Sequence, residues 1–206
     1  MNKLFIIGLP RTGTTSISAA LLDHFKVAHT SYTKRAFELA DVISDCPCFS
    51  DYPQLDMLFP ESKFVYLQRN LEQWIPSIQM LLNKMLPSLN SDTYVNPILK
   101  RSFDQTFDLS CVEDPLDAAH LTRCYKRHEQ AVMDYFYGRD NILSIDVNKV
   151  DSLSQLLDFL GIQHSGEKQL PHLNIGKLVD GWKDIKHTHK INPNAAGRDG
   201  RKFFDY

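Results

Sequence analysis

The segment over residues 4–22 constrains the fold more than any other part of the chain. Residues 4–8 form a short apolar run that ends in Gly8, and from Thr14 onward Ser, Ala and Leu alternate at helical spacing. We therefore expect a buried strand, a tight loop and a helix, in that order. This unit is typical of α/β folds, in which ligands bind beyond the carboxyl ends of parallel strands.

The expected loop combines glycine, hydroxyl and guanidinium groups. Gly8 and Gly13 enclose four residues, one of which is Arg11. Hydroxyl side chains lie in the loop and directly after it: Thr12, Thr14, Thr15 and Ser16. Successive backbone N–H groups at the start of a helix attract anions, whereas a turn that only connects two elements has no use for an arginine beside several hydroxyls. The loop is therefore predicted to bind a phosphate or sulfate group.

The loop differs from the nucleotide-binding P-loop in its catalytic groups. A P-loop carries a lysine after its last glycine and works with a strand-end aspartate near Mg²⁺. Here Thr14 takes the place of that lysine, and the apolar strand expected over residues 63–68 is followed by Arg69. No metal site is therefore expected. A phosphotransferase that acts on a small metabolite through a degenerate P-loop stays open as an alternative.

Residues 10–15 read Pro-Arg-Thr-Gly-Thr-Thr, which resembles the 5′-phosphosulfate loop of the sulfotransferases that use 3′-phosphoadenosine-5′-phosphosulfate (PAPS). That superfamily also has a strand that ends in arginine, followed eight residues later by a serine, and the two groups hold the 3′-phosphate. Arg69 and Ser77 have this spacing. Independently of any family, a guanidinium that leaves a strand and a hydroxyl two turns into the next helix can converge on one dianion.

The resemblance implies a set of donor-binding residues: Arg11, Thr12, Gly13, Thr14, Thr15, Ser16, Arg69, Ser77 and, in a loop late in the chain, Lys177. It also implies in-line, metal-independent transfer of a sulfuryl group from PAPS to a hydroxyl or amine of a small molecule or glycan. The product of the donor would be 3′-phosphoadenosine-5′-phosphate (PAP). Arg11 is the expected catalytic cation, and its role is electrostatic because arginine does not give up its proton. A protein that binds PAP or PAPS without catalysis is the non-enzymatic alternative.

Asp45 is the expected general base. Cytosolic members of the superfamily often have a histidine in the corresponding stretch ahead of the 3′-phosphate arginine, and this chain has Asp45 there, just before Cys46 and Pro47. Asp51 and His29 are the alternatives for the same role. A simpler explanation, in which Asp45 only caps a turn before Pro47, also stays open.

The remainder of the chain alternates between strand and helix patterns. Further strands are expected at residues 25–30, 46–49, 63–68 and 141–147. Further helices are expected at residues 34–43, 71–86, 117–137 and 153–160. This alternation predicts a three-layer α/β/α fold, with helices on both faces of a central parallel sheet. The resemblance implies the P-loop-containing, sulfotransferase-like form of that fold.

The 206 residues predict a single domain. Within it, we expect residues 87–115 to form an irregular insertion that lies over a pocket, because isolated hydrophobic residues alternate there with Asn, Ser, Asp and Pro. Residues 184–206 are expected to form an extended or mobile tail. Acceptor pockets are built from variable loops, so the acceptor is expected beside residues 31–37 and 87–115.

Composition excludes several classes of partner. The 23 Lys and Arg residues nearly balance the 25 Asp and Glu residues, so the chain has no field that would attract nucleic acid. No apolar segment approaches the ~20 residues of a membrane span, and the N-terminal apolar run is too short for a secretory signal. The four cysteines are irregularly spaced and are expected to be reduced. These features predict a cytoplasmic protein and leave its oligomeric state open.

Overall fold

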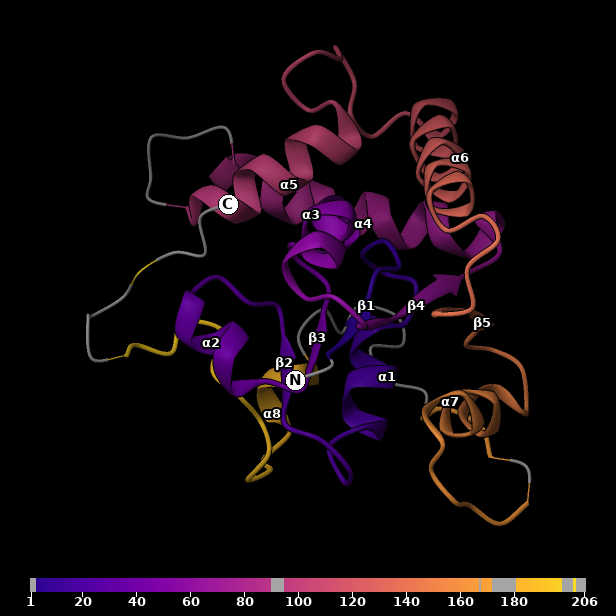
Figure 1. Cartoon of the computed structure of the whole chain (residues 1–206). Helices are drawn as coiled ribbons and strands as arrows, with labels where there is room; N and C mark the ends of the chain where they lie inside the picture. The colour runs from indigo at the N-terminus through magenta and orange to yellow at the C-terminus, as the bar shows by residue number, and fades with distance from the viewer. Residues whose placement is uncertain (1–2, 90–94, 167, 172–180, 198–201, 203–206) are drawn as a thin grey trace.

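A central parallel sheet organises the chain. The computed structural model describes residues 3–89, 95–166, 168–171, 181–197 and 202. Within them the strands form one five-stranded sheet in the order β2-β3-β1-β4-β5, with every neighbouring pair parallel (Figure 1). The strands are β1 (Leu4–Ile6), β2 (Val27–His29), β3 (Val42–Ser44), β4 (Lys63–Gln68) and β5 (Ile142–Asp146).

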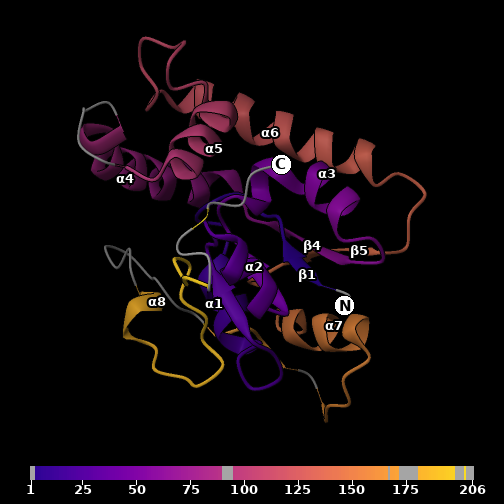
Figure 2. The ribbon, with the colours of Figure 1, turned by 60° about the vertical axis from the view of Figure 1, so that its left-hand side comes forward.

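Helices cover both faces of this sheet, as Figure 2 shows, with α3 and α6 on one side and α1 and α7 on the other. The helices are α1 (Thr14–Ala20), α2 (Lys34–Leu39), α3 (Cys48–Leu58), α4 (Leu71–Leu89), α5 (Pro97–Phe107), α6 (Ala118–Tyr135), α7 (Ser152–Leu160) and α8 (Gly181–Asp184). The predicted three-layer α/β/α architecture is therefore confirmed. No helix in the described ranges is both long and apolar enough to cross a membrane.

The central strand is buried on both faces. Leu4 and Ile6 pack into the apolar layer shared with α1 and α7, whereas Phe5 and Ile7 pack into the layer shared with α3 and α6. Side chains alternate across a strand, so a strand between two helical layers must be apolar at every position. This requirement explains the uninterrupted apolar run at the start of the sequence.

The order of the strands brings several loops to one edge. From β1 the chain crosses to β2 and β3 on one side, and then returns past β1 to β4 and β5 on the other. Strand order therefore reverses at β1. In open α/β sheets ligands bind at such a reversal, outside the carboxyl ends of the strands. The segments that follow β1, β2, β3 and β4 all emerge at that edge.

Two predicted elements in the first half of the chain were wrong. The third strand lies at Val42–Ser44 rather than over residues 46–49, which form a turn and the start of α3 instead. The helix expected over residues 34–43 ends at Leu39. Val42 and Ile43 are fully buried and pair with both β1 and β2. These two β-branched residues therefore belong to the sheet, although the predicted helix had been extended through them.

The irregular insertion expected over residues 87–115 contains a regular helix, α5. Asn96 caps it by accepting a hydrogen bond from the backbone N–H of Ile98 at 3.0 Å. Phe103 and Phe107 are buried in a third apolar cluster that also contains Trp74. The helix therefore forms because a few well-spaced hydrophobic residues find a tertiary partner, which the local sequence does not reveal.

The described part of the expected tail lies along β2. The N–H of Val27 donates to the carbonyl of His189, and the N–H of Ile191 donates to the carbonyl of Val27, both at 2.9 Å. Val27 and Lys190 form a single parallel bridge. Residues 189–191 thus cover the free edge of β2.

We predict that Gly8→Ala destabilises the fold by ~1–3 kcal/mol through overpacking. A Cβ at Gly8 would lie 2.6 Å from the Cβ of Leu67 and 2.7 Å from Thr12 Oγ1, so β4 or the loop would have to move. Urea unfolding measures the loss. Gly197→Ala is the matched control, because its added Cβ would meet Arg35 only at 3.5 Å. Equal stability of the two variants would contradict the proposed close approach of the loop to β4.

Candidate active site

The loop between β1 and α1 has a strained backbone. Arg11 and Gly13 have φ angles of 71° and 112°, in the left-handed region that residues other than glycine rarely adopt. A Cβ at Gly13 would also lie 2.9 Å from Cγ1 of Val147, so glycine is required there for two reasons. Thr12 is fully buried and donates from Oγ1 to the carbonyl of Leu9 at 2.7 Å. Its side chain therefore shapes the loop.

Arg11, Arg69 and Ser77, which the sequence predicts to bind the donor, lie together. Arg69 follows β4 and donates from Nη1 to the carbonyl of Arg11 at 2.6 Å. Arg11 in turn donates from Nε to Ser77 Oγ at 2.9 Å. The hydroxyl of Tyr125, on α6, accepts from the backbone N–H of Arg69 and donates to its carbonyl, both at 3.0 Å. Tyr125 thus fixes the point where β4 ends.

A buried tryptophan supports the same loop from behind. Trp74, on α4, is fully buried and donates from Nε1 to the carbonyl of Pro10 at 2.9 Å. The bond links the loop to the apolar cluster that also contains Phe103 and Phe107. This role was not predicted from the sequence, in which its only signal is a tryptophan placed five residues after Arg69.

The two arginines form a local concentration of positive charge. Burial lowers the pKa of Arg11, the charge of Arg69 lowers it further, and Asp45 opposes both effects. Burial also lowers the pKa of Arg69. Within the described part of the chain, Arg69 has no salt bridge to a carboxylate. An anion bound between the two guanidinium groups would therefore stabilise both charges.

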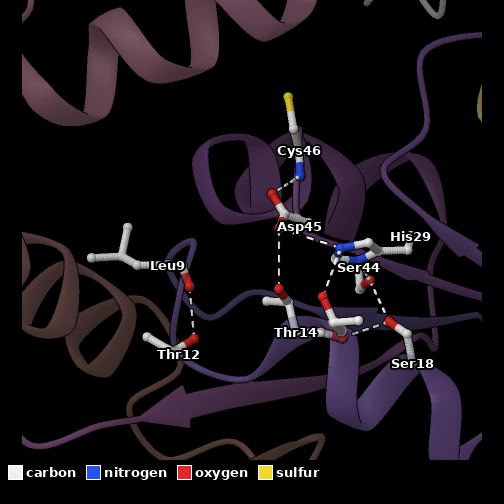
Figure 3. A network of polar contacts seen from close by, with 9 residues as sticks. Leu9, Thr12, Thr14, Ser18, His29, Ser44, Asp45 and Cys46 are labelled. Carbon is white, nitrogen blue, oxygen red and sulfur yellow. Dashed lines mark hydrogen bonds and ion pairs between the residues drawn. The ribbon is translucent and has the colours of Figure 1, made fainter. Parts of the chain in front are cut away.

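Acidic and imidazole groups lie on the other side of the loop, at the ends of β3 and β2 (Figure 3). Asp45 has a φ of 60° and accepts from the N–H of Cys46 at 2.8 Å and from the hydroxyl of Thr14 at 3.0 Å. His29 Nε2 lies 3.8 Å from Asp45 Oδ2 and 3.2 Å from Thr15 Oγ1. Two of the three candidate bases therefore lie together beside the loop between β1 and α1, which we name the phosphate loop after its predicted ligand.

A chain of hydroxyl groups fixes the tautomer of His29 (Figure 3). Ser18 donates to the carbonyl of Thr14 at 2.7 Å, so its oxygen must accept the proton of Ser44 across their 2.6 Å contact. Ser44 has then used its only proton and accepts from Nδ1 of His29 at 2.8 Å. In the neutral ring, Nε2 therefore carries the lone pair, and it faces the loop.

Asp51, the third candidate base, lies elsewhere. Asp51 is only 1% exposed and forms a bidentate ion pair with Arg101, with distances of 2.9 and 2.5 Å. It is not among the residues that line the pocket at the phosphate loop. Lys177 lies outside the described residues.

An open pocket joins the arginines to the His29 and Asp45 groups. Its volume is about 520 Å³ with its solvent-open mouth included. The lining residues are Pro10, Arg11, Gly13, Thr14, Thr15, Ser16, His29, Asp45, Arg69 and Leu81. One pocket thus contains cations, hydroxyl groups and a base, which are the groups that transfer of an anionic group requires.

One cluster in the described chain has side chains of metal-ligand type, and it lies apart from this pocket. The ligand atoms of Asp108, His120 and Cys124 lie within 4.8 Å of one another. However, His120 Nε2 donates to the carbonyl of Phe107 at 2.9 Å, and Asp108 is paired with Arg127 at 2.8 Å. The groups are already engaged within the protein.

Comparisons with known proteins identify the family of the chain. A family model described as a sulfotransferase domain matches residues 23–179, which is more than half of the chain. A solved structure, a sulfotransferase from Alicyclobacillus acidocaldarius, matches with a TM-score of 0.51 and 15% identity, covering 85% of this chain and 86% of that one. This second likeness supports the fold. A search of curated proteins found no match. With the family model spanning most of its length, the chain belongs to the sulfotransferase domain family.

Proposed function

We propose that this sulfotransferase-family protein moves a sulfuryl group from PAPS to a hydroxyl or amine acceptor, in line and without a metal. The observation that carries the proposal is the placement of Arg11 and Arg69 on one side of a single pocket, with His29 and Asp45 on the other. Ser77 accepts a hydrogen bond from Arg11 beside this pocket. Cations suit the phosphates of the donor, and a base suits the hydroxyl of the acceptor.

The donor is proposed to lie across the loop. Arg69 and Ser77 would hold the 3′-phosphate. Arg11 would hold the 5′-phosphosulfate together with the hydroxyl groups at the start of α1. These hydroxyl groups belong to Thr14, Thr15 and Ser16. Thr12 and Gly13 would contribute through the backbone of the loop, because the Thr12 side chain is already bonded to Leu9. Lys177 remains a proposed contact of the donor.

In the proposed reaction the acceptor oxygen forms a bond to sulfur as the bond from sulfur to the 5′-phosphate oxygen breaks. The acceptor proton passes to Nε2 of His29, which the hydroxyl chain through Ser44 keeps unprotonated in the neutral ring. Negative charge develops on the departing PAP, where Arg11 stabilises it. Asp45, 3.8 Å from His29 Nε2, stabilises the resulting imidazolium. This proposal assigns the proton to His29, which was one of the two alternatives to Asp45 in the sequence-based expectation, the other being Asp51.

We predict that Arg69→Ala weakens PAP binding by roughly 10- to 100-fold and leaves ADP binding nearly unchanged, because ADP lacks the 3′-phosphate. Isothermal titration calorimetry gives both affinities. Arg69 also supports the Arg11 carbonyl, so Ser77→Ala is a second test that leaves this bond in place. It should weaken PAP by about fivefold. Equal losses for PAP and ADP would mean that Arg69 only shapes the loop.

Single-turnover kinetics should show that His29 and Asp45 act as a unit. We predict that His29→Ala and Asp45→Asn each lower the rate of transfer by ~10²–10⁴, and that the double variant is no slower than the worse of the two. PAP affinity should stay unchanged in all three. A full rate in His29→Ala combined with a collapse in Asp45→Asn would assign the base to Asp45. Binding of PAPS without transfer to any acceptor would support the non-catalytic alternative.

Transfer should be insensitive to chelators. Dialysis of the protein against EDTA is predicted to leave the rate unchanged, because the pocket residues offer cations and hydroxyl groups with Asp45 as their one carboxylate. Metal-free buffer with and without added Mg²⁺ provides the comparison. Loss of activity with EDTA and recovery with Mg²⁺ would instead favour the phosphotransferase alternative.

A further inference from the structure

A second pocket, of about 1390 Å³ with its solvent-open mouth included, adjoins the first. Thr15 and His29 line both pockets, so the two cavities meet at these two residues. The far wall comes from α8 and the segment that follows it, between Trp182 and Pro193. A group bound there lies beyond the phosphate loop, on the opposite side of it from Arg69.

Trp182 supplies an unused hydrogen-bond donor in this wall. It is only 7% exposed, and its Nε1 has no acceptor within the described chain. The indole packs edge-on against the ring of His29, with centroids 5.5 Å apart. Buried indole N–H groups normally have a partner, and Trp74, the other tryptophan, has one in the carbonyl of Pro10. This N–H is closed to solvent, so an oxygen atom of a ligand in the pocket would satisfy it after a small rotation of the Trp182 side chain.

The same wall is cationic. Its charged side chains are Lys183, Lys186 and Lys190, with His187 beside them, and no Asp or Glu is among the described residues that line the pocket. The Lys190 ammonium lies 4.8 Å from the centre of the Trp182 ring and donates to the carbonyl of Ile185 at 2.9 Å. Asp23 lies 3.8 Å from His187, but its side chain is 84% exposed. The charge of the wall therefore favours an anionic ligand.

Apolar surface completes the pocket, through the Trp182 ring, Ile185, Ile191 and Pro193. We propose that this pocket binds the sulfuryl acceptor, and that the acceptor is a hydroxylated ring compound that also carries an anionic group such as a carboxylate. The proposal rests on the proposed function. The acceptor hydroxyl meets His29, which takes its proton as the oxygen–sulfur bond forms and PAP departs. The ring packs on the apolar surface, and the anionic group lies among the lysines.

The two tryptophans allow the donor and acceptor proposals to be tested separately. Each indole gives one N–H signal in a ¹H–¹⁵N spectrum, and Trp182→Phe assigns them. PAP should move the Trp74 signal, because that indole is bonded to the phosphate loop. The probe 3-(4-hydroxyphenyl)propanoate, added to the protein with PAP present, should move the Trp182 signal. Its uncharged counterpart, 4-propylphenol, should bind at least fivefold more weakly.

Variants of the wall test the two recognition elements. Trp182→Phe, which keeps a ring but removes the N–H, and Lys186→Glu, which reverses a charge, should each weaken the probe about fivefold or more in ligand-detected titrations. Both should leave PAP affinity unchanged. Lys126→Glu, on the exposed face of α6, is the charge-matched control and should bind the probe normally.

The outcomes separate the two proposals. If the probe leaves the Trp182 signal unmoved, or binds all variants equally well, the acceptor pocket is refuted. If 4-propylphenol binds as tightly as the carboxylate, the anionic character of the acceptor is refuted. If PAP fails to bind while the probe still moves Trp182, the donor assignment fails and the pocket stands as a site for anionic ring compounds.

Discussion

Two hydrogen bonds to backbone carbonyls of the phosphate loop hold the proposed site in shape. Arg69 bonds to the carbonyl of Arg11 and Trp74 to that of Pro10, and both donors come from the end of β4 and the start of α4. The loop needs this support because two of its residues have positive φ angles. A residue proposed to bind the 3′-phosphate therefore also sets the geometry of the loop proposed to bind the sulfated end of the donor. The two halves of donor recognition are mechanically linked.

The other side of the site depends on the register of the sheet. His29 and Ser44 are directly paired between β2 and β3, and this pairing lets the serine accept from Nδ1 of the imidazole. Ser18 lies one turn of α1 after Thr14 and closes the chain of hydroxyl groups. A slip of one residue between β2 and β3 would turn Ser44 to the opposite face and release the histidine. The position of His29, the proposed base, therefore depends on the same strand register that defines the sheet.

Features that depend on nearby residues were predictable from the sequence. The run over residues 63–68 matches β4, and the eight-residue spacing from Arg69 to Ser77 follows from one strand end and one helix. Long-range contacts were not predictable. The hydroxyl chain joins Ser18 to Ser44, which lie 26 residues apart, and α5 forms only because its phenylalanines meet α3 and α4. Helical spacing in the local sequence also concealed β3, whose residues are selected by burial in the sheet.

Backbone hydrogen bonds along β2 position the proposed acceptor pocket, whereas side-chain hydrogen bonds to loop carbonyls position the proposed donor site. β2 is the edge strand of the sheet, and an edge strand exposes backbone groups that need partners. The segment after α8 provides them through His189 and Ile191, so the residues that cover the edge also form the wall of the second pocket. Backbone bonds position this segment, which leaves its side chains free to vary without loss of the sheet. In such an arrangement the side chains of the segment beside β2 can alter the proposed acceptor pocket without altering the loop at β1 that is proposed to bind the donor.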